Sequence, residues 1–237
     1  MIELILGIYT TVLYQPIYNL VVFLSVLSPE QNLGWAIVLL ALIVRIAFFP
    51  LTLKGYQTDA KLEEASQQIK QIEDDINLDS KIKRTKITEI MKTRGINPVA
   101  EIVSLLGQLV FLAVLYQIVQ QGLHPPYSHI YRFVPKPNDI QTVFFGMDIS
   151  KSGNFFLSGV AGIILFAEQL WEYEVKKHIP EATFSGRWYP LLLPIATFIL
   201  LLLLPATKAI FLAVSILFSI GVRLMYTLGR LGRKKDV

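Results

Sequence analysis

The chain has 237 residues, of which 53% are hydrophobic, 17% are charged and none is cysteine, and its formal net charge is +4. A soluble domain of this length needs a more highly charged surface, so a soluble enzyme and a nucleic-acid-binding domain are excluded. The lack of cysteine excludes a disulfide-stabilised secreted module, thiol catalysis and thiolate metal sites.

The hydrophobic residues are concentrated in five segments that carry almost no charge. They are Leu33–Phe49, Pro98–Val119, Phe155–Trp171, Tyr189–Leu204 and Ala209–Leu228. A helix needs about 20 apolar residues to cross the hydrocarbon core of a bilayer, with roughly 17 as the lower limit. The sequence therefore predicts an all-α polytopic membrane protein with five transmembrane helices, at residues 31–53, 97–120, 154–171, 188–205 and 208–228.

The basic residues lie mainly on one side of these predicted spans. Seventeen of the 22 Lys and Arg residues fall within or beside the segments 54–96, 172–187 and 229–237, against four on the other side. The positive-inside rule therefore places these three segments in the cytoplasm and the loop 121–153 outside. We expect a multi-pass protein of the plasma membrane with its N-terminus outside and its C-terminus, a short basic tail, in the cytoplasm.

Residues 1–30 are apolar as well, and three interpretations are possible. A signal peptide is disfavoured because the chain begins with an acidic residue, Glu3, where a basic region is expected. A sixth span would place several tyrosines and Pro16 in lipid, whereas tyrosines are typical of the headgroup layer. We favour an amphipathic helix that lies in the outer interface, and a sixth span remains the alternative.

The cytoplasmic segment 54–96 shows two runs of apolar residues at helical spacing, separated by Asn77-Leu78-Asp79-Ser80. This pattern predicts a hairpin of two amphipathic helices, with Asp79 or Ser80 as the N-cap of the second. A solvated spacer would not need two apolar stripes. We therefore favour a docking or lipid-contacting role over a spacer.

Arg45 lies well inside the first predicted span, twelve residues after Leu33. An arginine at the centre of the bilayer costs about 2.5–3.5 kcal/mol on insertion scales, so its side chain must face protein or water. One interpretation is a structural arginine whose charge is satisfied by backbone carbonyls. We favour a functional arginine that faces water, because charges inside a membrane are usually functional.

Other polar residues are predicted at a similar depth in the remaining spans. Any single serine is more simply explained by helix packing, but together these residues predict a polar cavity in the inner half of the membrane, open to the cytoplasm. They are Ser104, Gln108, Glu168, Gln169, Thr197, Ser215, Ser219 and Arg223.

Signatures of an enzyme are missing from the sequence. The three histidines, His124, His129 and His178, lie outside the spans and lack the spacing of metal ligands. No nucleophile elbow or phosphate-binding glycine loop is present. We therefore expect no catalytic activity, no cofactor and no metal.

An ordered set of motifs resembles the YidC family of membrane protein insertases. Arg45 is followed by Pro50-Leu51-Thr52, Asn97-Pro98 opens the second span, and Leu105-Leu106-Gly107-Gln108 follows within it. The motif Phe145–Ile149 precedes the third span, and Leu204-Pro205-Ala206 with Val214–Ile220 resembles the last two spans. The resemblance extends from about Tyr14 to Arg223.

The resemblance implies an insertase with an outer interfacial helix, a cytoplasmic helical hairpin and a hydrophilic groove in the inner leaflet. The groove arginine corresponds to Arg45, and the glutamines of the second and third spans correspond to Gln108 and Gln169. Newly made membrane proteins and the lipid bilayer are the implied partners, and the ribosome and the main secretion channel are further candidates. The short basic tail argues against strong ribosome docking, and no large extracytoplasmic domain is expected, as in the short members of the family.

Glu168 departs from the family pattern, in which this position is usually apolar. It either pairs with Arg45 or points toward headgroup water, and the sequence does not decide between the two. The main alternative function is a small-solute transporter or channel with Arg45 as an anion site. An intramembrane enzyme is a weaker alternative, because no pair of nucleophile and base is found.

Overall fold

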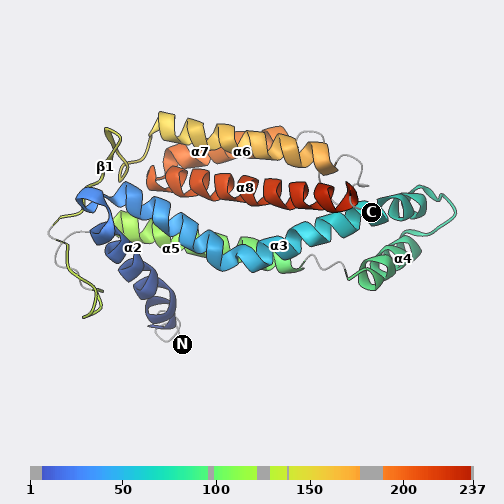
Figure 1. Ribbon diagram of the computed structural model, residues 1–237, viewed down its shortest axis with the longest axis horizontal. Helices are drawn as coiled ribbons and strands as arrows, with labels where there is room; N and C mark the ends of the chain where they lie inside the picture. Colours follow the sequence, from blue (N-terminus) through green and yellow to red (C-terminus); the bar gives the residue numbers. More distant parts are fainter. Residues whose placement is uncertain (1–6, 96–98, 122–128, 138, 177–188, 236–237) are drawn as a thin grey trace.

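The computed structural model describes residues 7–95, 99–121, 129–137, 139–176 and 189–235, and for some helical residues it describes the backbone only. Consecutive long helices run in opposite directions along the long axis of the molecule (Figure 1). They are α3 (Leu33–Asp74), α5 (Val99–Gln121), α6 (Phe155–Lys176), α7 (Tyr189–Leu203) and α8 (Thr207–Lys235). Each of these helices covers all or nearly all of one of the five apolar segments.

Length and composition separate the apolar helices into two groups. Gly7–Leu27, Leu33–Leu62 and Thr207–Leu228 are long and apolar enough to cross a membrane. The apolar helical stretches Leu109–Gln121, Phe155–Trp171 and Leu192–Leu203 are shorter. The architecture is therefore that of a helical membrane protein, and the number of five spans stays a prediction.

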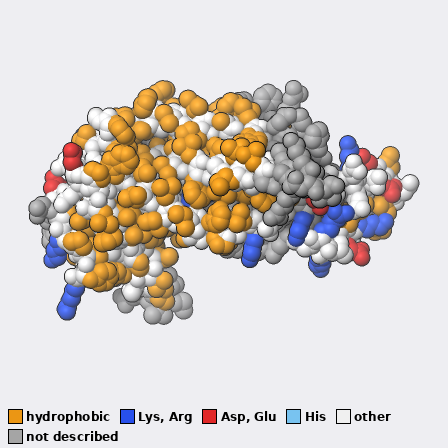
Figure 2. Space-filling view, in the orientation of Figure 1, with side chains coloured by type: hydrophobic (Ala, Val, Ile, Leu, Met, Phe, Trp, Pro, Cys, Tyr) orange, Lys and Arg blue, Asp and Glu red, His pale blue; other side chains and the backbone are white. Residues whose placement is uncertain are grey.

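Figure 2 shows where the apolar side chains lie on one face of this bundle. Hydrophobic side chains cover the middle of the molecule, and charged side chains gather toward its two ends. This distribution fits a body surrounded by hydrocarbon with ends in the headgroup layers and water.

The N-terminal helix slants away from the bundle axis (Figure 1). It consists of a π-helical turn, η1 (Thr10–Tyr14), and α2 (Gln15–Leu27), in which Asn19 is buried. The side-chain amide of Asn19 donates to the His129 carbonyl at 2.8 Å and accepts from the Tyr131 amide at 2.6 Å. These bonds fix α2 to the loop between α5 and α6, which is the predicted outer loop. Because the segment is also long enough to span, the interfacial position stays a prediction.

The first predicted span and the first helix of the cytoplasmic hairpin form one continuous helix. α3 has 42 residues and passes through Pro50 without a break in assignment. The second hairpin helix, α4 (Ser80–Thr93), begins after the predicted turn, and the Asp79 carboxylate caps it by accepting from the Ser80 amide at 2.8 Å. A helix therefore leaves the bundle and carries the hairpin at its far end (Figure 1).

The outer loop contains a small β-hairpin that the all-α prediction missed. β1 (Val143–Phe144) pairs with β2 (Met147–Asp148) in antiparallel register, and the turn between them has φ of 48° at Phe145 and 77° at Gly146. Two consecutive residues with positive φ are typical of a type I′ turn.

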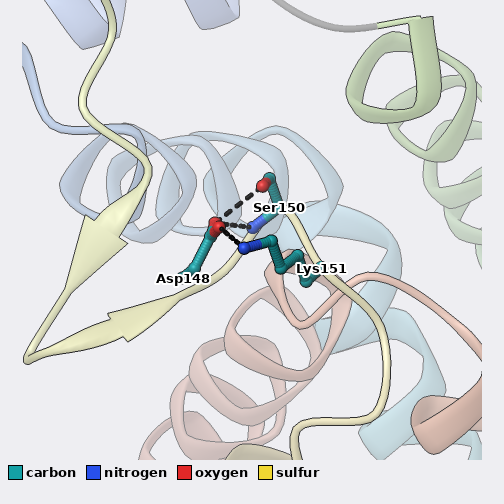
Figure 3. Close-up of polar contacts among 3 residues, drawn as sticks. All are labelled: Asp148, Ser150 and Lys151. Carbon is teal, nitrogen blue, oxygen red and sulfur yellow. Dashed lines mark hydrogen bonds and ion pairs between the residues drawn. The ribbon is translucent and has the colours of Figure 1, made fainter.

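Asp148 stabilises the segment that follows this hairpin (Figure 3). Its carboxylate accepts from the Ser150 hydroxyl at 2.6 Å and from the Ser150 amide at 3.1 Å, and forms an ion pair with the Lys151 ammonium at 3.0 Å. The Ser150 hydroxyl is the main cause that lowers the pKa of Asp148 to about 2. The Ile149 carbonyl in turn accepts from the Thr207 amide, so this loop holds the first residue of α8.

Three apolar clusters account for the packing of the described residues. The largest joins α2, α3, α5, the outer loop and the first turns of α8, with Ile37, Leu40 and Leu115 fully buried. A second cluster, around Ala161, Leu201 and Ala209, joins α6, α7 and α8. The third lies within the hairpin, around Ala65 and Ile69, and is separate from the other two. α8 is therefore shared by both halves of the bundle.

Candidate functional site

Arg45 lies on α3, about 18 Å along the helix from its first residue at a rise of 1.5 Å per residue. Its side chain is partly buried. The Glu168 carboxylate of α6 and the Tyr56 hydroxyl of α3 both act electrostatically on its guanidinium. The structure therefore places Glu168 near enough to Arg45 for its charge to act on the guanidinium, and an ion pair between the two stays a prediction.

Tyr56 links this position to α8, and the sequence analysis did not single it out. Its hydroxyl donates to the Ser219 carbonyl at 3.1 Å, and the guanidinium carbon of Arg223 lies 5.7 Å from the centre of its ring. Tyr56 follows Arg45 by eleven residues, which is close to three full helical turns, so the two share one face of α3. That spacing places Tyr56 on the same side of the helix as Arg45, but it does not indicate the contact with Ser219.

The predicted serines of α8 lie on its buried face. Ser215 is 2% exposed and Ser219 is 7% exposed. The Ser215 hydroxyl has no hydrogen-bond partner among the described residues, although a buried hydroxyl normally has one. Because Tyr56 binds the carbonyl of Ser219, this serine stripe lies on the side of α8 that faces α3.

For Ser104 and Gln108 the structure describes the α5 backbone and not the side chains, so the prediction for them lies outside the described residues. The position of this part of α5 is nonetheless defined by Gly107. A Cβ atom at Gly107 would lie 2.9 Å from the ring of Phe48, three residues after Arg45. α5 therefore approaches α3 closely near the depth of Arg45.

Glu168 and Gln169 occupy successive positions on α6, and both side chains are partly buried. Glu168 reaches Arg45 electrostatically. Since residues one apart on a helix point about 100° away from each other, Gln169 does not share the direction of Glu168.

Lys208 is one of the four basic residues that the sequence analysis places on the side opposite the hairpin, and its burial was not predicted. It lies in the first turn of α8 and is 4% exposed. Its ammonium nitrogen lies 3.3 Å from the centre of the Tyr116 ring of α5. The first turn of α8 therefore also contains a buried cation.

The arrangement supplies a fixed positive charge, a neighbouring carboxylate and buried hydroxyls inside an apolar bundle. Within the described residues, no group of three or more His, Cys, Asp and Glu side chains is placed to hold a metal ion. Such a site is suited to bind polar or acidic groups reversibly, through charge-assisted hydrogen bonds.

A family model described as "60Kd inner membrane protein" matches residues 23–231 of the chain. The chain belongs to this family, the YidC family. It is therefore an integral membrane protein, in agreement with its apolar helices.

Three relatives, each named "Membrane protein insertase YidC", show the extent of the similarity. The protein of Wolinella succinogenes is 35% identical over 92 residues, which is 39% of this chain and 17% of that protein. The protein of Nitrosomonas europaea is 33% identical over 112 residues, 47% of this chain and 18% of that protein. The protein of Stutzerimonas stutzeri is 26% identical over 169 residues, 67% of this chain and 28% of that protein. The matched part of this chain thus spans less than a third of each relative.

Proposed function

We propose that the chain is a membrane protein insertase. It takes hydrophilic parts of a newly made membrane protein into a groove that is open to the cytoplasm, and it releases the passenger helix sideways into the bilayer. The observation that carries the proposal is the intramembrane Arg45, which interacts with Glu168 and is joined through Tyr56 to the buried serine face of α8. The printed name of the YidC relatives supports it.

The physical need for such a groove follows from the cost of moving peptide groups through hydrocarbon. Each backbone polar group without a hydrogen-bond partner costs several kcal/mol in the bilayer core. A hydrated groove that reaches halfway across the membrane shortens the dry part of the path. The passenger then needs only an apolar helix to remain in the bilayer after release.

The residues of the proposed groove act in two ways: some attract charge, and the others form hydrogen bonds. Arg45 attracts acidic side chains of the passenger, and Glu168 moderates this attraction and lowers the cost of burying the arginine. The remaining polar groups offer hydrogen bonds to the passenger or to water. They are Ser104, Gln108, Gln169, Ser215 and Ser219.

The proposed orientation follows from the distribution of the basic residues. The hairpin and the C-terminal tail face the cytoplasm, the N-terminus lies outside, and α2 lies in the outer interface. Newly made membrane proteins then reach the groove from the side on which they are synthesised. The ribosome and the main secretion channel are candidate partners on that same basis.

The test is an insertion assay with the purified full-length chain in lipid vesicles. The passenger is a single-span peptide with an acidic polar tail, and protection of the tail from added protease measures insertion. We expect Arg45→Ala to lower the insertion rate about tenfold, because a charge-assisted hydrogen bond contributes about 1.5 kcal/mol or more. Lys54→Ala, which removes an exposed positive charge from the same helix, is the matched control and should leave the rate unchanged.

Two results would contradict the proposal. Vesicles with the unaltered chain that insert the passenger no faster than empty vesicles would exclude an insertase. Rapid release of a small anion trapped inside the vesicles, abolished by Arg45→Ala, would support the channel instead.

A further inference from the structure

The turn between β1 and β2 presents an apolar surface to the surroundings of the protein. Phe145 in this turn is 77% exposed, and Val143 on β1 is 53% exposed. A Cβ atom at Gly146, the second turn residue, would meet no atom within 4 Å, so the turn projects freely from the bundle. Asn, Asp or Gly is usual in a two-residue turn of this type, and contact with water does not account for a phenylalanine there.

The backbone of Phe145 is strained as well. Its φ of 48° lies in the left-handed region, which is unfavourable for a bulky side chain. Its ring lies 4.5 Å from that of Phe144 and 6.2 Å from that of Trp35, measured between ring centres, yet most of its surface stays uncovered. Strained residues persist where other interactions offset the strain, which indicates a partner for Phe145 outside the chain.

Other residues near the turn and in the same loop are typical of a membrane interface. Trp35, in the first turn of α3, is 41% exposed and packs edge-to-face on Phe144 with 5.4 Å between ring centres. Further back in the loop, Phe133 is 82% exposed and stacks on Tyr131, and the neighbouring Arg132 is exposed. Tryptophan and tyrosine are enriched at the headgroup level of a bilayer, where long basic side chains extend toward the headgroups.

We propose that the hairpin of β1 and β2 is a lipid anchor, in which Phe145 and Trp35 lie among the phospholipid headgroups of the leaflet opposite the cytoplasmic hairpin. The backbone determines this depth. β1 and β2 pair over two residues each, and peptide groups of the turn that lack a partner are not tolerated in lipid-exposed hydrocarbon. The headgroup layer supplies water for these groups and apolar contacts for the rings. This leaflet is the outer one in the proposed orientation, and the inference rests on the proposed function in that respect alone.

A hydrogen bond and close packing join this anchor to the start of α3. The side-chain amide of Asn32 donates to the Val143 carbonyl at 2.7 Å, and the ring of Phe144 fills the space beside Gly34. The depth of the hairpin therefore sets the depth at which α3 enters the membrane. Arg45 lies about 18 Å further along the same helix, so the anchor also fixes the depth of this charge.

The first experiment measures where the turn lies in the membrane. The chain has no cysteine, so the fluorophore NBD can be attached to the single cysteine of F145C or, as the matched control, of D139C, an exposed position in the same loop. The full-length chain in phosphatidylcholine vesicles is treated with iodide on both sides, or contains lipids with a doxyl quencher near the headgroup. We expect iodide to quench the label at position 145 about threefold less than the label at position 139, and the doxyl lipid to quench it more strongly.

The second experiment separates a lipid contact from a packing role. F145N places a residue that accepts positive φ in the turn, so the unfolding temperature in detergent should be kept, while the aromatic contact with lipid is lost. The label is now on I46C, beside Arg45, where the native side chain is 62% exposed. This position is about 20 Å from the start of α3, beyond the middle of the hydrocarbon core, so an outward shift of α3 brings it closer to deep quenchers. We expect F145N to raise the ratio of deep to shallow doxyl quenching about 1.5-fold, and F145W to leave it unchanged.

Two results would overturn the inference. One is equal quenching by iodide at positions 145 and 139, which needs no folded F145N. The other is a lower unfolding temperature of F145N with an unchanged depth ratio, because Phe145 would then act by packing within the chain. None of these measurements uses passenger insertion, so a chain that inserts no passenger would refute the proposed function and leave the anchor in place.

Discussion

At the scale of single residues, the predicted pairing of Arg45 with Glu168 would determine how strongly the proposed groove attracts charged groups. The two side chains come from different helices, and Glu168 acts on the guanidinium of Arg45. A paired arginine is less costly to bury and attracts a passenger carboxylate less strongly than an isolated one. If the two residues pair, we therefore expect a more stable protein that binds acidic passenger groups less tightly.

A double-mutant cycle measures this pairing. We expect Arg45→Ala and Glu168→Ala, read as the free energy of unfolding in detergent, to show a coupling energy of about 1 kcal/mol or more. The control pairs Arg45→Ala with Glu30→Ala, an exposed residue at the outer end of the bundle, and these effects should add. Strict additivity in the first cycle would show that Glu168 is a solvated residue.

Gly34 is a second residue whose environment allows a sharp prediction. A Cβ atom there would lie 2.2 Å from two ring carbons of Phe144, which is buried in the outer hairpin. We expect Gly34→Ala to destabilise the protein by about 2 kcal/mol, because a closely packed site cannot take an added methyl group. Thermal unfolding in detergent measures the change.

A glycine of the same helix provides the matched control for this variant. No atom lies within 4 Å of a Cβ placed at Gly55, so Gly55→Ala should stabilise α3 by up to about 1 kcal/mol. Adding Phe144→Ala to Gly34→Ala should recover part of the loss. Equal effects at the two glycines would contradict the close approach of Phe144.

The Asp148 cluster predicts a pH dependence for the outer loop. The pKa of the Asp148 carboxyl is about 2 in the folded protein, against 3.8 for an aspartate in an unfolded chain. The bonds of the carboxylate therefore stabilise the folded state fully above about pH 4, and this stabilisation is lost as the pH falls toward 2. The expected contribution is about 1 kcal/mol, because the carboxylate is 29% exposed and solvent screens it. Asp148→Asn should therefore lower the unfolding temperature at pH 6, and should lower it by a smaller amount at pH 2.5.

Another aspartate of the same loop, Asp139, provides the control for this measurement. Asp139 is exposed, and Asp139→Asn should leave the unfolding temperature unchanged at both pH values. A deficit of Asp148→Asn that is as large at pH 2.5 as at pH 6 would show that the carboxylate does not act through its charge.

At the scale of elements, the cytoplasmic hairpin folds on its own contacts. Ala65 and Ile69 pack against Leu62 and the apolar face of α4, apart from the cores of the bundle. We expect a chain in which residues 59–91 are replaced by a flexible bridge to keep its helices and its unfolding transition. The same chain should insert passengers more slowly, because capture of the passenger is lost. Circular dichroism and the vesicle assay measure the two properties.

A milder variant controls for the altered chain length. Ile69→Asp removes the centre of the hairpin cluster and leaves every residue in place, so it should reproduce the loss of insertion with the bundle intact. A bundle that unfolds in either variant would show that the hairpin is structural.

The helices were predictable from the sequence because their signals are local. Each apolar run is a continuous stretch of the chain, and Asp79 directly precedes the helix that it caps. The β-hairpin was not, since its turn places a bulky residue, Phe145, at a positive φ where Asn or Gly is usual. The roles of Tyr56 and Lys208 were also missed. Both depend on partners more than 90 residues away in the chain, Ser219 and Tyr116 respectively, and local spacing contains no trace of such contacts.

At the scale of the whole molecule, the asymmetry between the two membrane faces defines the proposed groove. The chain has no cysteine, so single cysteines report on water without interference. We expect Ser219→Cys and Arg45→Cys to react with a polar thiol reagent added on the cytoplasmic side, and not with reagent added outside. Equal labelling from both sides would indicate a continuous pore and contradict an insertase.

A lipid-facing position on α8 shows whether labelling requires the groove. Leu217 is 53% exposed on the outside of the bundle and lies between the two buried serines. Leu217→Cys should react slowly from either side, because a thiol in hydrocarbon is not ionised. Rapid labelling at this position would mean that water surrounds the helix.

The continuity of α3 has a mechanical consequence. The helix has 42 residues and is therefore about 63 Å long, and Pro50 interrupts its hydrogen bonding. Measured from Pro50, one arm extends about 36 Å to Asp74 and the other about 7 Å to Arg45. A bend of about 5° at the proline, where helices bend most easily, moves the hairpin end by about 3 Å relative to the segment that carries Arg45. We therefore expect the hairpin to shift toward a passenger while the intramembrane charge keeps its place.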